Sequence, residues 1–344
     1  MRAALRRAAY ALAMGMTMAG AHGALAQGLA QIGPMAGGPA LTPSDSSGHA
    51  VHIFPVKSLA VSQVSRLAGP ALAYHGGPIM PTIAVYSIFW APPTLQNGAP
   101  ALLPAHYQSV ALGLATDYAG HTISSNNTQY YQTLAGVTTY VSGLSSGPGV
   151  GGSFGGAYVD ATPFPASGCT DTATPGNCLT DAQIQAEIAN VMALNGWTGG
   201  LDKMFLLYTA KGEGSCFDST STSCAYTQFC AYHGYFGVGP IVYGNEPYGD
   251  VAHCQTSGTP SPTGDAAADT AMTAASHELT EAITDPELNA WYSANGSEIG
   301  DICAYNYGTA IYLSGHANQF WNGRYYELQR EYDNRSASCV QVGP

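Results

Sequence analysis

Charged side chains are scarce in this chain, and basic side chains are the scarcest of all. Only 9% of the 344 residues are Asp, Glu, Lys or Arg, against about 25% in a typical soluble domain. Disordered chains usually combine high charge with low hydrophobicity. Because 46% of the residues are hydrophobic here, we expect a folded chain. The net charge of −12, with ten Lys and Arg residues in all, excludes nucleic acid as a natural partner.

Two motifs that would indicate other functions are missing. The glycine-rich stretch 147–156 lacks the Lys-Ser/Thr that completes a phosphate-binding loop. No CxxC occurs, so the eight cysteines favour disulfides over a thiolate metal site and indicate an oxidising compartment. The simplest pairing joins the cysteines in chain order, as Cys169–Cys178, Cys216–Cys224, Cys230–Cys254 and Cys303–Cys339.

The N-terminus reads as an export signal of residues 1–26. It begins with three arginines, continues with the apolar stretch Ala8–Ala21 and ends in the small-x-small site Ala24–Ala26. The apolar stretch is shorter than the ~20 residues that a membrane-spanning helix needs. We therefore expect a secreted, extracellular protein without a membrane span, with the periplasm and the cell wall as possible destinations.

The rest of the chain divides into an arm and one globular domain. Gly, Pro, Ala and Ser dominate residues 27–75, for which we expect a flexible arm, and residues 76–344 form the domain. Helical and strand-like patterns alternate along the domain, so the fold class is α/β (α+β), a mixed sheet flanked by helices and held by disulfides. The expected elements are strands at 82–90 and 201–210, helices at 104–120, 180–196 and 265–284, and a closing hairpin that turns at Asn322–Gly323.

The helix at 265–284 carries the pattern His277-Glu278-x-x-Glu281. His277 and Glu281 are four residues apart, so they lie one above the other on one face, nearly opposite an apolar stripe. The arrangement resembles the His-Glu-x-x-His of zinc proteases, with Glu281 in place of the second histidine. It predicts a zincin-like active helix, on which Glu278 is the catalytic carboxylate and His277 and Glu281 are metal ligands. The alternative is an ordinary solvated helix face.

The charge distribution around this helix favours the metal site. Between Lys211 and Arg324 there is no lysine or arginine, although the same stretch carries twelve acidic residues. A solvated helix face usually intersperses both signs of charge, because opposite charges one turn apart stabilise a helix and like charges destabilise it. Twelve carboxylates without a basic side chain therefore indicate a bound cation, unless the whole protein simply avoids Lys and Arg.

The remaining ligands are expected downstream and on a neighbouring strand. Asp301 follows Glu281 by twenty residues, a span that lets the chain turn and return along the helix, and we predict it as the third metal ligand. Glu298, Tyr307 and His233 are further candidates for the same cleft. One imidazole with two carboxylates suits zinc with an open position for water. Calcium, which rarely takes histidine, is the alternative.

Several stretches of the chain also resemble a known family. They appear in the order seen in the plant EXORDIUM or phosphate-induced protein 1 family, and they are YHGGPIMPTIAVYSIFW, FCAYHGYF, HELTEAITDPELNAWY, EIGDICAYNYGT and the closing WNGRYYELQREYDN. The resemblance covers residues 74–340. It implies secretion to the cell wall or apoplast and a link to growth and to brassinosteroid or phosphate responses, and it brings no established enzyme activity. The chain departs from the family in its signal sequence and in its cysteine layout near residues 169–224.

Two functional hypotheses follow from these observations. The first is a secreted metal-dependent hydrolase, a zinc peptidase in which His277, Glu281 and Asp301 hold the metal and Glu278 transfers the proton. The second is a non-catalytic extracellular or cell-wall protein of the EXORDIUM type, which binds a glycan or a partner and uses the acidic cluster as a structural cation site. In the second hypothesis Trp291 and Trp321 stack on sugars. The sequence leaves the substrate, peptide or cell-wall material, and the oligomeric state open.

Overall fold

The computed structural model describes residues 51–64, 71–143, 149–220, 223–254, 260–311 and 315–344. All of them belong to one compact unit, residues 37–344. The predicted export signal and the first part of the predicted arm lie outside the described residues.

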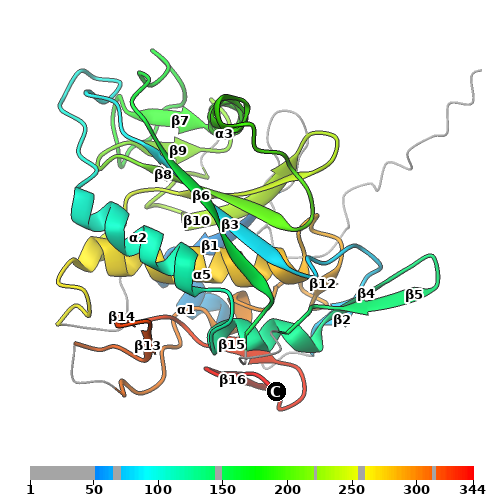
Figure 1. Cartoon of the computed structure of the whole chain (residues 1–344). Helices are drawn as coiled ribbons and strands as arrows, with labels where there is room; N and C mark the ends of the chain where they lie inside the picture. The colour runs from blue at the N-terminus through cyan, green and yellow to red at the C-terminus, as the bar shows by residue number, and fades with distance from the viewer. Residues whose placement is uncertain (1–50, 65–70, 144–148, 221–222, 255–259, 312–314) are drawn as a thin grey trace, which may run out of the picture. The chain divides into compact units, whose positions relative to one another are not determined.

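A mixed six-stranded sheet forms the centre of this unit (Figure 1). Its strands, in spatial order, are β1 (Val51–Pro55), β10 (Phe229–Phe236), β11 (Ile241–Glu246), β8 (Lys203–Thr209), β3 (Ile83–Trp90) and β6 (Gly152–Asp160). The strands β6, β3, β8 and β11 run parallel to one another. The strand β10 is antiparallel to β11, and β1 is antiparallel to β10 at the edge of the sheet.

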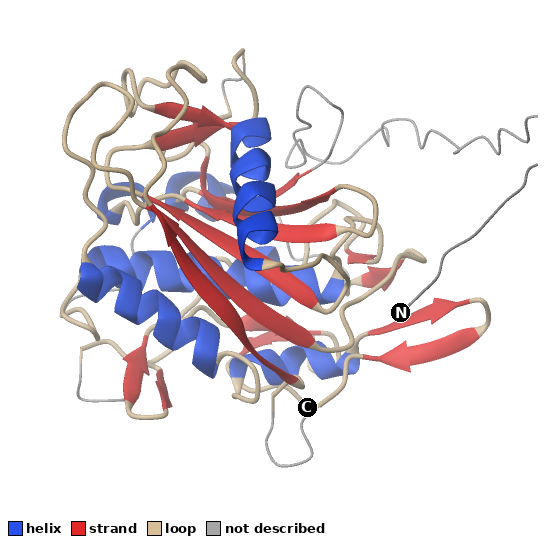
Figure 2. Ribbon diagram, turned by 45° about the horizontal axis from the view of Figure 1, so that its top comes forward, coloured by secondary structure: helices blue, strands red, loops and turns tan. Residues whose placement is uncertain are grey.

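Helices cover both faces of the sheet, and each face has its own hydrophobic core. The helices α2 (Ala105–Asp117) and α5 (Ala266–Thr284) pack on one face, and α3 (Asp181–Asn195) packs on the other. Figure 2 shows the sheet as a layer between α3 and the α2–α5 pair. A parallel sheet is normally covered on both faces, so the arrangement confirms the predicted α/β class with a mixed sheet flanked by helices.

Local sequence signals explain where the long helices begin and end. The hydroxyl of Thr180 accepts a hydrogen bond from the Gln183 N–H, and the Gln183 side chain accepts one from the Thr180 N–H, which is a capping box at the start of α3. Gly196 ends α3 in the left-handed conformation, with φ 66°. The carboxylate of Asp265 caps α5 by accepting hydrogen bonds from the backbone N–H groups of Ala267 and Ala268, and Pro286 follows the end of the helix.

Shorter elements complete the unit. The remaining helical segments are α1 (Lys57–Val64), α4 (Val251–Cys254), η1 (Ile123–Gln129) and η2 (Asp301–Cys303). The remaining strands pair two by two, as β2 (Ala73–Tyr74) with β12 (Trp291–Tyr292), β4 (Tyr131–Leu134) with β5 (Val137–Tyr140), β7 (Cys178–Thr180) with β9 (Gly214–Cys216), β13 (Gln319–Trp321) with β14 (Arg324–Tyr326), and β15 (Glu331–Asp333) with β16 (Ser338–Val340). The predicted turn at Asn322–Gly323 is confirmed, since both residues have positive φ, 48° and 85°.

All eight cysteines form disulfides, and the sequential pairing is confirmed. The bonds are Cys169–Cys178, Cys216–Cys224, Cys230–Cys254 and Cys303–Cys339. The largest separation along the chain is 36 residues, so each bond closes a local loop. None of the helices in the described residues is both long and apolar enough to cross a membrane.

The predicted flexible arm over residues 27–75 is wrong for residues 51–64, which form β1 and α1. Val51 and Ile53 pack with α3 on one face of the sheet, and Phe54 packs on the other. This two-sided burial explains the ordered strand, because a β-strand places alternate side chains on opposite faces. The Gly and Pro content of the flanking sequence concealed this five-residue pattern.

Candidate metal centre

The helix α5 is buried on every side, which excludes the solvated-face interpretation of its motif. Every residue from Ala268 to Thr284 is buried. The apolar stripe of α5 packs into the core formed with α2 and the sheet. The opposite face, with His277, Glu278 and Glu281 all 0% exposed, turns toward β1, β10 and the chain segment around η2. Burying charged groups is costly unless they are paired, so this face needs internal partners.

The three ligands predicted from the sequence converge. The Nε2 atom of His277 lies 3.1 Å from Oε1 of Glu281 and 3.9 Å from Oδ1 of Asp301. Glu281 Oε1 also accepts hydrogen bonds from the backbone N–H groups of Gly300 and Asp301, at 3.2 and 3.0 Å. This pair of bonds fixes η2 against the helix. A Cβ atom at position 300 would lie 2.6 Å from Nδ1 of His277, so the close contact between the backbone at position 300 and the His277 ring requires glycine.

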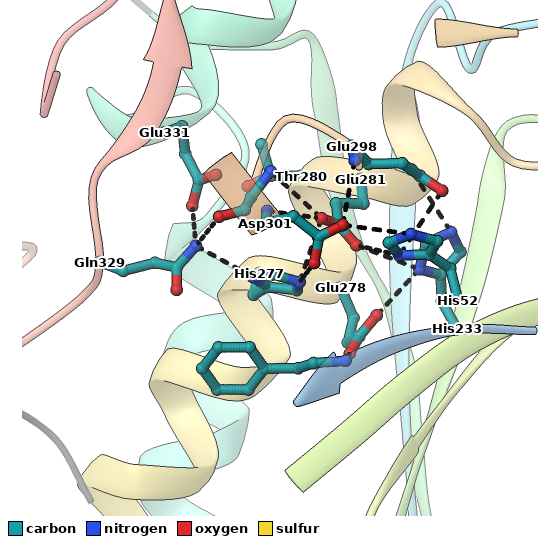
Figure 3. Close-up of polar contacts among 12 residues, drawn as sticks. His52, His233, His277, Glu278, Thr280, Glu281, Glu298, Asp301, Gln329 and Glu331 are labelled. Atoms are coloured by element: carbon teal, nitrogen blue, oxygen red, sulfur yellow. Dashed lines mark hydrogen bonds and ion pairs between the residues drawn. The ribbon is translucent and has the colours of Figure 1, made fainter. Parts of the chain in front are cut away.

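Two further histidines join the cluster from neighbouring strands (Figure 3). His52 of β1 and His233 of β10 are opposite each other in the antiparallel register. His52 places Nδ1 3.0 Å from Glu281 Oε2 and Nε2 3.2 Å from Asp301 Oδ2. His233 was a candidate cleft residue and does lie in the cluster. No sequence motif indicates His52, because it lies in the stretch predicted to be a flexible arm, and alternation over five residues is its only local signal.

The remaining candidates divide between the cluster and its surroundings. Glu278 accepts hydrogen bonds from His233 Nδ1, at 2.8 Å, and from the backbone N–H of Phe54, at 3.2 Å. Glu298 lies 3.6 Å from His52 Nδ1 and 3.9 Å from His233 Nε2. Both carboxylates therefore belong to the cluster. Tyr307 is buried beside Thr273, one turn before the motif on α5, and lies outside the cluster.

Gln329 orients the ring of His277 from the other side. Its amide nitrogen lies 2.9 Å from Nδ1 of His277 and also donates to the Gly300 carbonyl at 3.0 Å. The same amide is 3.4 Å from Glu331 of β15. Partners of this kind hold the ring of a metal-binding histidine in place, and here they turn Nε2 toward Glu281 and Asp301. No sequence motif indicates Gln329, because it is 52 residues away from His277 along the chain.

Several atoms in the cluster are buried without a hydrogen-bond partner among the described residues. They are Nε2 of His52, His233 and His277, Oδ1 of Asp301 and Oε2 of Glu298. Buried polar atoms in proteins are nearly always satisfied, so five such atoms gathered in one place need a common explanation. The candidate ligand atoms form two groups, each with its members within 4.8 Å of one another: His52, His233 and Glu281, and His277, Glu278 and Glu281. A cation in either group would accept electron pairs from nitrogen and oxygen atoms of these types.

Burial shapes the ionisation of the carboxylates. Burial first, and then the neighbouring carboxylates, raise the pKa of Glu278 and of Glu298 far above the usual range. Burial also raises the pKa of Asp301 to about 6, although His52 opposes this shift. Within the described residues, the ion pairs of the cluster carboxylates are all with histidines. The metal-free cluster is therefore short of positive charge.

The histidines and carboxylates of the cluster shift one another's pKa values. Burial would lower the pKa of His52, but the carboxylates of Asp301 and Glu281 raise it to about 9. Burial lowers the pKa of His233 to about 3. Burial would raise the pKa of Glu281, yet His277 and His52 bring it below the usual carboxylate range. A metal ion needs deprotonated ligands, so it would take the place of protons in this cluster.

The set of donors discriminates between metals. One group has two imidazoles with a carboxylate and the other has one imidazole with two carboxylates. Both sets match the nitrogen and oxygen ligands that zinc takes, whereas calcium prefers oxygen ligands alone. The cluster offers more donors than the four of a tetrahedral zinc site. Comparison with known protein families, with curated proteins and with solved structures finds no match.

Proposed function

We propose that the protein is a secreted zinc-dependent hydrolase that acts on peptides. His277, Glu281 and Asp301 hold the ion, and His233 offers a further donor from β10. The observation that supports the proposal is the convergence of buried imidazole nitrogens without hydrogen-bond partners on two carboxylates. The four disulfides fit the oxidising environment of a secreted protein. We also propose that the protein is extracellular and related to the EXORDIUM family, which its sequence resembles.

The residues around the ion divide the chemistry between them. Zinc supplies Lewis acidity, which polarises a carbonyl and acidifies water. A carboxylate oxygen of Glu278 lies within 4.8 Å of the ligand atoms of His277 and Glu281, where it would take a proton from the attacking water and pass it to the leaving amine. Gln329 holds His277 in its orientation throughout.

The test begins with elemental analysis of the purified protein, which should find about one zinc per chain. The substitution Glu278→Gln should then abolish hydrolysis of a peptide library and leave the zinc content unchanged. The matched control is Glu287→Gln, which changes a carboxylate outside the cluster and should leave both quantities unchanged. Loss of zinc together with activity in Glu278→Gln would contradict the assignment of Glu278 to proton transfer.

The burial of the cluster favours a second candidate, a non-catalytic extracellular protein with a structural zinc site. None of the cluster histidines and carboxylates named above is more than 4% exposed, whereas a catalytic ion must meet its substrate. Zinc that raises the melting temperature without any turnover in the peptide library would favour this candidate. Sugar stacking by tryptophan does not support it, because Trp291 and Trp321 are buried against aromatic neighbours.

A further inference from the structure

The strand β1 is the edge of the sheet and also the cover of the metal centre. Within the described residues it pairs with β10 alone, in antiparallel register from Val51 opposite Gly234 to Pro55 opposite Phe229. The side chains of Val51 and Ile53 pack into the core on the α3 face. His52 and Phe54 alternate with them and therefore point to the other face, where the metal centre lies.

His52 and Phe54 contact the residues that the proposed function assigns to zinc binding and proton transfer. His52 contacts Glu281 and Asp301, two of the proposed zinc ligands. The backbone N–H of Phe54 donates to Oε1 of Glu278, the proposed proton carrier, at 3.2 Å. The Phe54 ring lies with its centroid 4.4 Å from that of His277. The strand thus contacts all four groups that hold the ion or move the proton.

These contacts have the form of a bound peptide. The extended backbone of β1 pairs with the side of β10 that faces away from β11, and alternate side chains of β1 enter the site, as in peptide recognition by strand addition. The ring of Phe54 fits between His277 and Tyr305, whose ring centroid is 4.8 Å away in a stacked arrangement. The position next to the proton carrier is therefore shaped for an aromatic side chain.

We propose that β1 is an internal pseudosubstrate that occupies the binding site for an extended peptide with an aromatic residue. This inference rests on the proposed hydrolase function. A substrate peptide adds to β10 in the place of β1 and puts its aromatic side chain between His277 and Tyr305. The substrate therefore binds only when β1 has left. The full burial of the cluster then describes the closed state of an enzyme and not a structural zinc site.

A reversible covalent lock tests the proposal in the full-length, zinc-loaded protein. A Cβ atom at position 234 would lie 3.1 Å from Cγ1 of Val51, so the pair Val51→Cys and Gly234→Cys has the close approach that a disulfide needs. Oxidation of the double variant fixes β1 to β10, and mild reduction releases it. Comparing two redox states of one variant removes differences in folding. Wild-type protein under the same treatment, with thiols counted, controls for its own disulfides.

The binding probe is a fluorescent peptide with the sequence of residues 51–57, measured by anisotropy. The reduced double variant should bind this peptide at least tenfold more tightly than the oxidised variant, and should hydrolyse the peptide library at least tenfold faster. A peptide with alanine in place of phenylalanine should bind at least tenfold more weakly. In the otherwise wild-type chain, Phe54→Ala should raise the affinity for the probe at least tenfold, because it weakens the internal competitor.

The outcomes separate this proposal from the hydrolase on which it rests. Zinc-dependent turnover and probe binding that are equal in the two redox states would overturn the role of β1 and leave the hydrolase standing. Probe binding by the reduced form alone, without hydrolysis of any peptide, would support the exchange of β1 for a peptide and overturn the hydrolase.

Discussion

The substitution Glu281→Gln tests the metal centre most directly, because Glu281 connects all its parts. It preserves the shape of the side chain and removes its charge. The oxygen Oε1 accepts from the Gly300 and Asp301 N–H groups and faces His277 Nε2, and Oε2 lies 3.0 Å from His52 Nδ1. The amide oxygen of glutamine can still accept from the backbone, so the fold around η2 should persist while one anionic metal donor is lost.

The expected loss of zinc affinity is large. Removing a partner that only orients a metal ligand typically costs 10- to 100-fold in affinity, and removing the ligand itself should cost at least as much. We expect a decrease of at least ~100-fold, or about 2.7 kcal/mol. At saturating zinc the same free energy disappears from the stability of the protein, which corresponds to a decrease in melting temperature of roughly 5 °C or more.

Competition with a chromophoric chelator measures the zinc affinity, and thermal unfolding with and without zinc measures the stability. The matched control is Asp269→Asn, which neutralises another buried carboxylate of α5, bonded to Thr263 rather than to the cluster. It should leave the zinc affinity unchanged. If Glu281→Gln binds zinc within about threefold of wild type, the cluster is not the metal site and the reasoning from its atoms without partners is wrong.

Two further predictions concern stability. Burial and the neighbouring Asp160 raise the pKa of Glu187 to about 9 from 4.5, so the folded state holds a proton that the unfolded state releases, and the stability contributed by this group falls as pH rises from about 4.5 to 9. In urea denaturation, the unfolding free energy of Glu187→Gln relative to wild type should therefore increase from pH 5 to pH 8, by on the order of 2 kcal/mol. A difference between variant and wild type that is equal at both pH values would refute the raised pKa. Thr180→Ala removes the cap of α3 and should cost about 1 kcal/mol in the same assay, and an unchanged urea midpoint would show that this cap contributes little.

Local signals account for the parts of the fold that the sequence predicted correctly. The capping box of α3, the Asp265 cap of α5 and the turn at Asn322–Gly323 each depend on residues within a few positions of one another. The turn between β4 and β5 carries no such local signal. The chain turns at Ala135–Gly136 with positive φ at both residues, and alanine gives no indication of such a turn.

The sequence by itself determined the motif on α5 and the lack of basic neighbours around it, because these are properties of spacing and composition, whereas the sequential disulfide pairing was the simplest prediction and the structure confirmed it. Only the tertiary structure decided that His52 and Gln329 belong to the site, that the motif faces the interior and that β1 closes the site. His52 on β1 and Glu281 on α5 are 229 positions apart, and a strand–helix contact over such a distance depends on the packing of both faces of the sheet. That packing brings three histidines together from three elements, and no local pattern of residues encodes it.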